Sequence, residues 1–349
     1  MVLKRMAFPD PDKRKIQMSD IARLAGVSTA TVSRALNGSE LINDETRVRI
    51  QELARSLNYS INVRAKNLRL GDDRTIAVVI PRDQASKQHV SDPFFLGMLG
   101  SLADALTDQQ YDLLLSRVDA DHLGDLAALY DSGRASGIIV IGQWRHHDQL
   151  NEMALRRVPF VVWGAQLAGQ LYCSVGSDNR SGGQLATAHL LGLGRRRIAF
   201  LGDTDLPEVA QRHEGYLLAH QQHGVAVDPA LHIPAPFTAG EAQAAMQAFM
   251  QHGVKLDGLF AASDLIAMNA MGVLVGHGLD VPRDVSVVGY DDIEAAAHCH
   301  PPLTTIRQSI ELAGAEMVDC LRLLMQGKPA APRVLATSLQ IRQSSIAAR

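Results

Sequence analysis

The stretch VSTATVSRALNG at residues 27–38 combines four hydroxyl side chains with an arginine and an asparagine. Serine and threonine hydroxyls compete for backbone hydrogen bonds, so they are poor choices for a helix that only has to be stable. On a helix over residues 28–37, Val32, Ala35 and Leu36 share the inner face. The other face is small, polar and cationic at one point: it carries Thr29, Ser33 and Asn37, with Ala30 and Arg34 beside them.

Those residue types suit a helix that enters the major groove of DNA. Hydroxyls reach phosphates or base edges, arginine binds guanine through two hydrogen bonds, and alanine contacts a thymine methyl group. Gly26 ends the preceding helix SDIARLAG, and Ser28 caps the next one, which together predict a helix-turn-helix. The alternative is a plain helical bundle, which the composition of the exposed face disfavours.

Three helices are expected before residue 58. The first turns Ile21, Leu24 and Ala25 inward, and the third runs from Asp44 to Leu57 behind an Asn43 cap. Residues 1–16 are expected to form a flexible arm. Residues 59–70 are neither Gly/Ser-rich nor Pro-rich, and they predict a linker that could become a short helix.

Charge is unevenly distributed along the 349 residues. Residues 1–70 hold 13 Lys and Arg against 7 Asp and Glu, whereas the whole chain has a net charge of −3. A basic head on an acidic body indicates that only the head meets a polyanion. The three cysteines do not form a disulfide pattern, and no signal peptide or membrane-spanning run is apparent, so we expect a cytoplasmic protein that does not bind a membrane.

From Thr75 onward, apolar runs alternate with helical stretches. There are eight such runs: TIAVVI, YDLLLS, GIIVIG, FVVW, YCSVGS, RIAFLG, GLFAAS and VSVVGY. Continuous apolar strands between helices indicate parallel sheets that are covered on both faces. Eight units are too many for one small sheet, so they predict two doubly wound lobes with a ligand-binding cleft between them.

These motifs resemble the LacI/GalR family of bacterial transcriptional regulators. The likeness rests on AGVS-x-x-TVSR-x-LN in the head and on SDPFF, GLGRRRIAFLG, LFAASDLIAM, VSVVGYDDIE and PPLTTIRQ in the body. It covers nearly all of residues 17–345. It implies a homodimeric regulator with an all-α helix-turn-helix head and a periplasmic-binding-protein-like effector domain of two parallel-sheet lobes.

The resemblance assigns DNA contacts residue by residue. The positions that match are Ser28, Thr29, Ala30, Thr31, Ser33, Arg34, Asn37, Tyr59, Asn62, Lys66 and Leu68. Leu68 matches the leucine that wedges into the minor groove and kinks the operator. Two departures stand out: Ile61 replaces the usual hinge proline, which removes a rigid helix start, and Lys66-Asn67 replaces the usual Arg or Gln.

The resemblance also places nine side chains at the cleft: Asp92, Phe94, Trp144, Arg212, Phe237, Ser263, Asp264, Asp291 and Gln308. Each follows a predicted strand or begins a predicted helix or crossover. Carboxylates, arginine and glutamine bind paired hydroxyls, and flat aromatic rings stack on the C–H faces of a sugar. A helix cap is an equally good explanation for Asp264, and lobe packing for Trp144.

The expected domains are the head at 17–58, a hinge at 59–74 and the effector and dimerisation domain at 75–349. The first lobe is expected over about 75–165 and 308–337, and the second over about 166–307 and 338–349, with crossings near 165, 307 and 337. His298-Cys299-His300 is too crowded for one metal ion, and no catalytic constellation is apparent, so we expect neither metal, cofactor nor enzymatic activity.

The sequence therefore predicts a repressor of carbohydrate-utilisation genes. A mono- or disaccharide in the cleft would release it from palindromic, double-stranded operator DNA. The alternatives are a regulator with a purine-like corepressor or a protein ligand, and a transport-type sugar-binding protein, which would not need residues 17–70.

Overall fold

The computed structural model describes residues 18–36, 39, 41–57, 74–82 and 88–346. It divides into two units, Met1–Asp73 and Arg74–Arg349. The predicted arm at 1–16 and the linker residues 59–73 lie outside the described residues.

The first unit contains three helices: α1 (Met18–Ala25), α2 (Thr29–Leu36) and α3 (Asp44–Ser56). Their common core includes Ile21, Val32 and Ile50, each fully buried. The predicted cap is confirmed, because the Asn43 side chain accepts a hydrogen bond from the Thr46 N–H at 2.8 Å. The prediction for Leu24 is wrong: it is 57% exposed. The core side of α1 runs through Ala22 and Ala25, and Leu24 lies on the other side of Ile21.

The first sheet of the second unit is entirely parallel, and we call it and its helices the first lobe. Its strands, in spatial order, are β11 (Arg333–Leu335), β5 (Cys173–Ser177), β4 (Phe160–Trp163), β3 (Gly137–Ile141), β1 (Thr75–Val79) and β2 (Asp112–Ser116). One face packs against α5 (Pro93–Asp108) and α13 (Ile310–Met325). The other face packs against η1 (Ala120–Leu126), α6 (Ala127–Asp131) and α7 (His147–Leu155).

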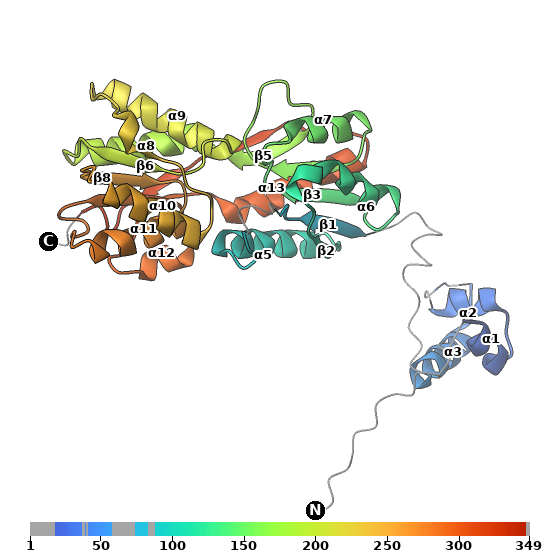
Figure 1. Ribbon diagram of the computed structural model, residues 1–349. Helices are drawn as coiled ribbons and strands as arrows, with labels where there is room; N and C mark the ends of the chain where they lie inside the picture. Colours follow the sequence, from blue (N-terminus) through green and yellow to red (C-terminus); the bar gives the residue numbers. More distant parts are fainter. Residues whose placement is uncertain (1–17, 37–38, 40, 58–73, 83–87, 347–349) are drawn as a thin grey trace, which may run out of the picture. The chain divides into compact units, whose positions relative to one another are not determined.

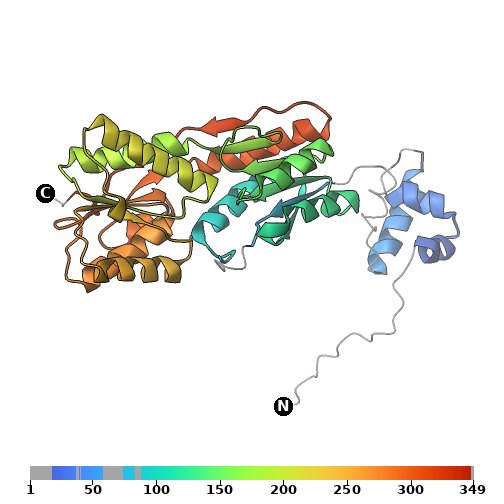
Figure 2. The same cartoon turned by 45° about the horizontal axis from the view of Figure 1, so that its top comes forward.

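The second sheet forms the second lobe. Its strands, in spatial order, are β12 (Ser338–Gln340), β10 (Thr304–Arg307), β9 (Ser286–Asp291), β8 (Gly258–Ala261), β6 (Ile198–Leu201) and β7 (His232–Ile233), with β12 antiparallel to β10. The helices α8 (Asn179–Gly192) and α9 (Pro207–Gln222) cover one face (Figures 1 and 2). The opposite face carries α10 (Ala239–Gln251), α11 (Asp264–Gly276) and α12 (Glu294–His298), and η2 (Pro229–Leu231) precedes β7. All eight predicted apolar runs form strands, and the two doubly wound lobes are confirmed.

The first crossing between the lobes differs from the prediction. It lies between Ser177 and Asn179, not near residue 165, because β5 pairs with β4 in the first sheet with Val161 opposite Cys173. Parallel neighbours are ordinarily joined by a helix, whereas residues 164–172 contain none. The helix-free connection between β4 and β5 therefore looks, in the sequence, like a crossing from one lobe to the other. The other two crossings, Arg307 to Ile310 and Leu335 to Ser338, fall where they were predicted.

Two glycines let α8 and α9 approach unusually closely. A Cβ at Gly183 would lie 2.0 Å from the Arg212 carbonyl oxygen, and one at Gly215 would lie 2.1 Å from the Arg180 carbonyl oxygen. Backbone therefore packs directly on backbone at this helix pair. The contact fixes the height of Arg212 above the second sheet.

We expect Gly183→Ala to lower the free energy of unfolding by about 1–3 kcal/mol, because the added methyl group forces the two helices apart. The matched control is Gly192→Ala at the end of the same helix, where a Cβ meets nothing within 4 Å. That variant should be neutral or slightly stabilising, by up to about 1 kcal/mol. Urea denaturation of both variants measures the difference, and equal stabilities would contradict the close-approach argument.

Candidate functional site

A cleft lies between the two lobes at the carboxyl ends of their strands. It is lined by Gln88, Asp92, Phe94, Phe95, Ile141, Gly142, Trp144, Trp163, Leu206, Glu208, Arg212, Phe237, Ser263, Asp291 and Gln308. Eight of the nine side chains predicted for an effector site are among them. Ligands of open parallel sheets bind beyond this end of the strands, so the position agrees with the fold.

Arg212 is buried on α9 and is held on three sides. Its Nε donates to Asn179 Oδ1 at 2.9 Å, and one Nη donates to the Ala262 carbonyl oxygen. Its guanidinium carbon stacks 3.8 Å from the centroid of the Tyr290 ring. This support pre-positions the remaining N–H groups toward the cleft, at little entropic cost when a ligand binds.

Asp291, Gln308 and Ser177 form a hydrogen-bonded chain at the lobe junction. The Gln308 amide donates to Asp291 Oδ1 at 2.6 Å, and the Ser177 hydroxyl donates to Gln308 Oε1 at 2.6 Å. Ser177 ends β5 in the first lobe, whereas Asp291 ends β9 in the second. Asp291 has a φ of 123°, a conformation that non-glycine residues rarely adopt. The chain ties a strained cleft residue to both lobes.

The cleft carboxylates are partly desolvated. Burial raises the pKa of Asp291 to about 7; Arg212 opposes this rise and the charge of Asp92 adds to it. Burial also raises the pKa of Asp92, which caps α5 by accepting from the Phe94 N–H at 2.9 Å and accepts from Gln88 Nε2 at 3.0 Å. Burial raises the pKa of Glu208 as well. The three acids therefore lie in a poorly hydrated site.

Aromatic side chains supply the apolar walls. The Phe94 ring lies 6.4 Å from that of Trp163 in the first lobe. Trp144, which follows β3 with a φ of 51°, packs against the core of the second lobe. Phe237 also contacts that core. Flat rings beside carboxylate and guanidinium groups form the combination that binds a polyol on both its C–H and O–H sides.

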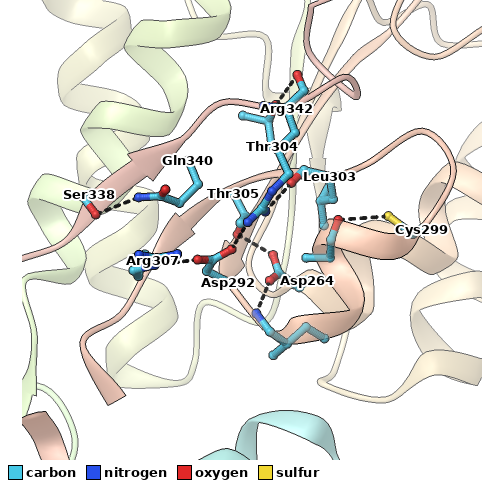
Figure 3. Close-up of polar contacts among 12 residues, drawn as sticks. Asp264, Asp292, Cys299, Leu303, Thr304, Thr305, Arg307, Ser338, Gln340 and Arg342 are labelled. Atoms are coloured by element: carbon cyan, nitrogen blue, oxygen red, sulfur yellow. Dashed lines mark hydrogen bonds and ion pairs between the residues drawn. The ribbon is translucent and has the colours of Figure 1, made fainter. Parts of the chain in front are cut away.

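Asp264 lies outside the cleft, contrary to the prediction. It is fully buried, accepts from the Thr305 hydroxyl, and accepts from the Ile293 N–H at 2.9 Å (Figure 3). Ser263, not Asp264, caps α11, accepting from the Ile266 N–H at 3.3 Å. Burial and the neighbouring charge of Asp291 raise the pKa of Asp264 well above its usual value. Asp264 holds β10 and the β9–α12 loop together.

Seven lining residues were not predicted: Gln88, Phe95, Ile141, Gly142, Trp163, Leu206 and Glu208. Two of them had a signal in the sequence. Glu208 precedes Arg212 by four residues, which places both on one helix face. Trp163 ends an apolar strand, as the predicted site residue Asp291 does, and Trp144 follows one closely.

In the head, α2 presents Thr29, Ala30 and Arg34 as exposed side chains. Thr31 and Ser33 are half-buried. The Ser28 hydroxyl accepts from the Thr31 N–H at 3.1 Å and thereby caps the helix, as predicted. Five other predicted DNA contacts lie outside the described residues: Asn37, Tyr59, Asn62, Lys66 and Leu68.

Comparison with known proteins gives the family. Residues 17–62 match the profile of the bacterial regulatory proteins of the lacI family, and residues 187–345 match a periplasmic binding protein-like domain. The HTH-type transcriptional regulator CelR of Thermobifida fusca is 32% identical over 341 residues, which cover 95% of this chain and 99% of CelR. This chain belongs to the LacI family. It is a DNA-binding transcriptional regulator.

Other family members are similar over most of their length. The ribose operon repressor of Haemophilus influenzae is 30% identical and the PurR repressor of the same species (strain PittEE) is 28% identical. Each alignment covers 87% of this chain, together with 90% and 89% of the respective relative.

Solved structures of the family share the fold. A CelR–cellobiose complex superposes with a TM-score of 0.70 at 30% identity, covering 95% of this chain and all of that one. The lac repressor dimer bound to operator and an anti-inducer gives a TM-score of 0.82 at 24% identity, covering 96% of this chain and all of that one.

None of the helices in the described part of the chain has the length and apolar character that a bilayer crossing requires.

We expect Arg212→Lys to lower the free energy of unfolding by about 2–4 kcal/mol, because an ammonium cannot replace the planar fork and leaves buried acceptors unpaired. Arg180→Lys, in an exposed position on the neighbouring helix α8, is the control and should stay within about 0.5 kcal/mol of the wild type. Denaturant titration reports both values. An unchanged free energy of unfolding in Arg212→Lys would show that the hydrogen bonds of Arg212 do not support the site.

Proposed function

We propose that the chain is a sugar-responsive repressor that acts as a homodimer on a roughly palindromic operator. The observation that carries the proposal is the cleft, in which Arg212, Asp291 and Gln308 converge beside the rings of Trp144 and Phe237. The CelR structure, in complex with cellobiose, supports a mono- or disaccharide as the ligand. The ribose operon repressor among the relatives supports a role in carbohydrate utilisation.

The proposed domain roles follow the predicted boundaries, with one change. Residues 17–58 bind DNA, residues 59–74 form the hinge, and residues 75–349 bind the effector and the second subunit. The first lobe extends to Ser177 because β5 belongs to its sheet. Leu68 wedges into the operator, with Ile61 in place of the usual proline.

The proposed switch is a change in the angle between the lobes. Three short crossings join them, which permits hinge motion. A sugar that touches Asp92 and Trp144 on one lobe and Arg212 and Asp291 on the other stabilises one angle over another. Only such differential affinity shifts the equilibrium, and here it weakens operator binding.

We expect Arg34→Ala to lose about 1–3 kcal/mol of specific affinity, because the exposed guanidinium reads a base. The measurement titrates the full-length protein with a duplex selected from random DNA and with an unrelated duplex. Arg55→Ala removes an equal charge from the end of α3 and serves as the control. It should lower the affinity for both duplexes alike, whereas Arg34→Ala should reduce the preference for the selected one. An unchanged preference would remove Arg34 from base readout.

We expect Asp291→Ala to abolish the response to sugar while operator affinity without ligand is retained, because truncation leaves sugar hydroxyls unpaired. The experiment titrates the selected operator with the wild type and the variant in the presence of sugars and nucleobases. Asp125→Ala, an exposed acid in η1, is the control and should respond as the wild type does. A wild type that ignores every sugar and responds to a nucleobase would overturn the ligand class in favour of a purine-like corepressor.

A further inference from the structure

The cleft carries more negative than positive charge. Among the described residues that line it, Asp92, Glu208 and Asp291 are acidic, whereas Arg212 is the single cation. Of the acids, Asp92 and Glu208 stand on opposite lobes, on the cap of α5 and in the first turn of α9. A ligand between the lobes is therefore flanked by carboxylates on both sides.

The cation is already partly engaged. Arg212 already donates to Asn179 and to the Ala262 carbonyl oxygen, and its face is stacked on Tyr290. It also faces the charge of Asp291, which it stabilises. The remaining N–H groups of the fork are enough for a hydroxyl, but a phosphate here would have to compete with acids that are fixed in place.

Glu208 lies beside the backbone of the opposite lobe. Burial raises the pKa of its carboxyl, and the backbone N–H groups of Gln143 and Ala165, which follow β3 and β4 of the first lobe, oppose this rise. Neighbouring contacts also join the lobes: Arg145 pairs with Asp203 at 2.6 Å, and the Gln211 amide donates to the Gln166 carbonyl oxygen at 3.1 Å. Glu208 therefore lines the cleft at a place where the two lobes are in contact.

We propose that this cleft selects uncharged polyols, that it rejects the same sugars when they are phosphorylated, and that Glu208 sets this selectivity. The inference rests on the proposed function, since it names the ligand class of that site. Hydroxyl groups donate to the three carboxylates. Where these acids are ionised, a phosphate dianion has only acceptor oxygens for them and adds like charge in a poorly hydrated space, which is an effective way to reject a ligand.

The test compares matched pairs by isothermal titration calorimetry of the full-length protein. The pairs are glucose with glucose 6-phosphate, ribose with ribose 5-phosphate, and cellobiose with its 6-phosphate. For any pair whose neutral member binds, the phosphorylated member should bind at least about 100-fold more weakly. Equal or tighter binding of the phosphorylated member would overturn the inference.

The residue assignment is tested with Glu208→Gln, which keeps the size and an acceptor oxygen but removes the charge. The ratio of the two affinities should fall at least about 10-fold, mainly through tighter binding of the phosphorylated sugar. Glu214→Gln, an exposed site on the same helix, is the control and should leave the ratio unchanged. An unchanged ratio in a folded Glu208→Gln protein would remove Glu208 from selectivity. If that variant does not fold, Asp92→Asn keeps the cap of α5 and should shift the ratio in the same direction.

Operator titration with the same sugars separates the two proposals. A phosphorylated sugar that binds tightly and releases the operator would overturn this inference and leave the sugar-responsive repressor standing. A protein that binds no member of any pair and responds to none would overturn both.

Discussion

A buried guanidinium must find an acceptor for its N–H groups and a partner for its charge, and Arg212 sets this requirement for the second lobe. Asn179, Ala262 and Tyr290 meet it from α8, the end of β8 and β9. The backbone contact at Gly183 holds α9 at the height where all three are within reach. The same contacts that satisfy the charge inside the lobe direct the remaining donors outward. Stability and ligand recognition therefore depend on one side chain.

The second constraint is the lobe junction, where polar side chains must stay satisfied whether the cleft is open or closed. Gln308 lies on a crossing and bridges Ser177 to Asp291, so it belongs to both lobes. Glu208 lies on α9, near the Gln143 and Ala165 backbone of the first lobe. If the cleft opens by hinge motion, Glu208 moves away from that backbone, whereas the bonds of Gln308 do not have to break, because a crossing moves with both lobes. Gln308 therefore marks the pivot of the proposed motion, and Glu208 marks the edge of the cleft that opens.

The sequence predicts this architecture well where one physical signal decides the outcome. Continuous apolar runs identify eight strands, and Asn43 before two acids identifies the start of α3. The sequence predicts the structure less well where tertiary packing decides the position of a residue or strand. Asp264 follows a strand as a ligand-binding residue would, but Gly289 leaves room for its carboxylate inside the sheet packing, since a Cβ there would lie 2.3 Å from Oδ1. The position of β5 depends on pairing with β4 across a connection without a helix, which local sequence does not encode.

Thermodynamic linkage relates sugar binding in the acidic cleft to operator binding. If a sugar lowers operator affinity by some factor, operator must lower sugar affinity by the same factor. That coupling is limited by the difference in sugar affinity between the two lobe angles. If Glu208 rejects phosphorylated sugars as proposed, the carboxylate that sets the selectivity lies where the two lobes are in contact. On that proposal, a substitution that relaxes the selectivity also alters the coupling.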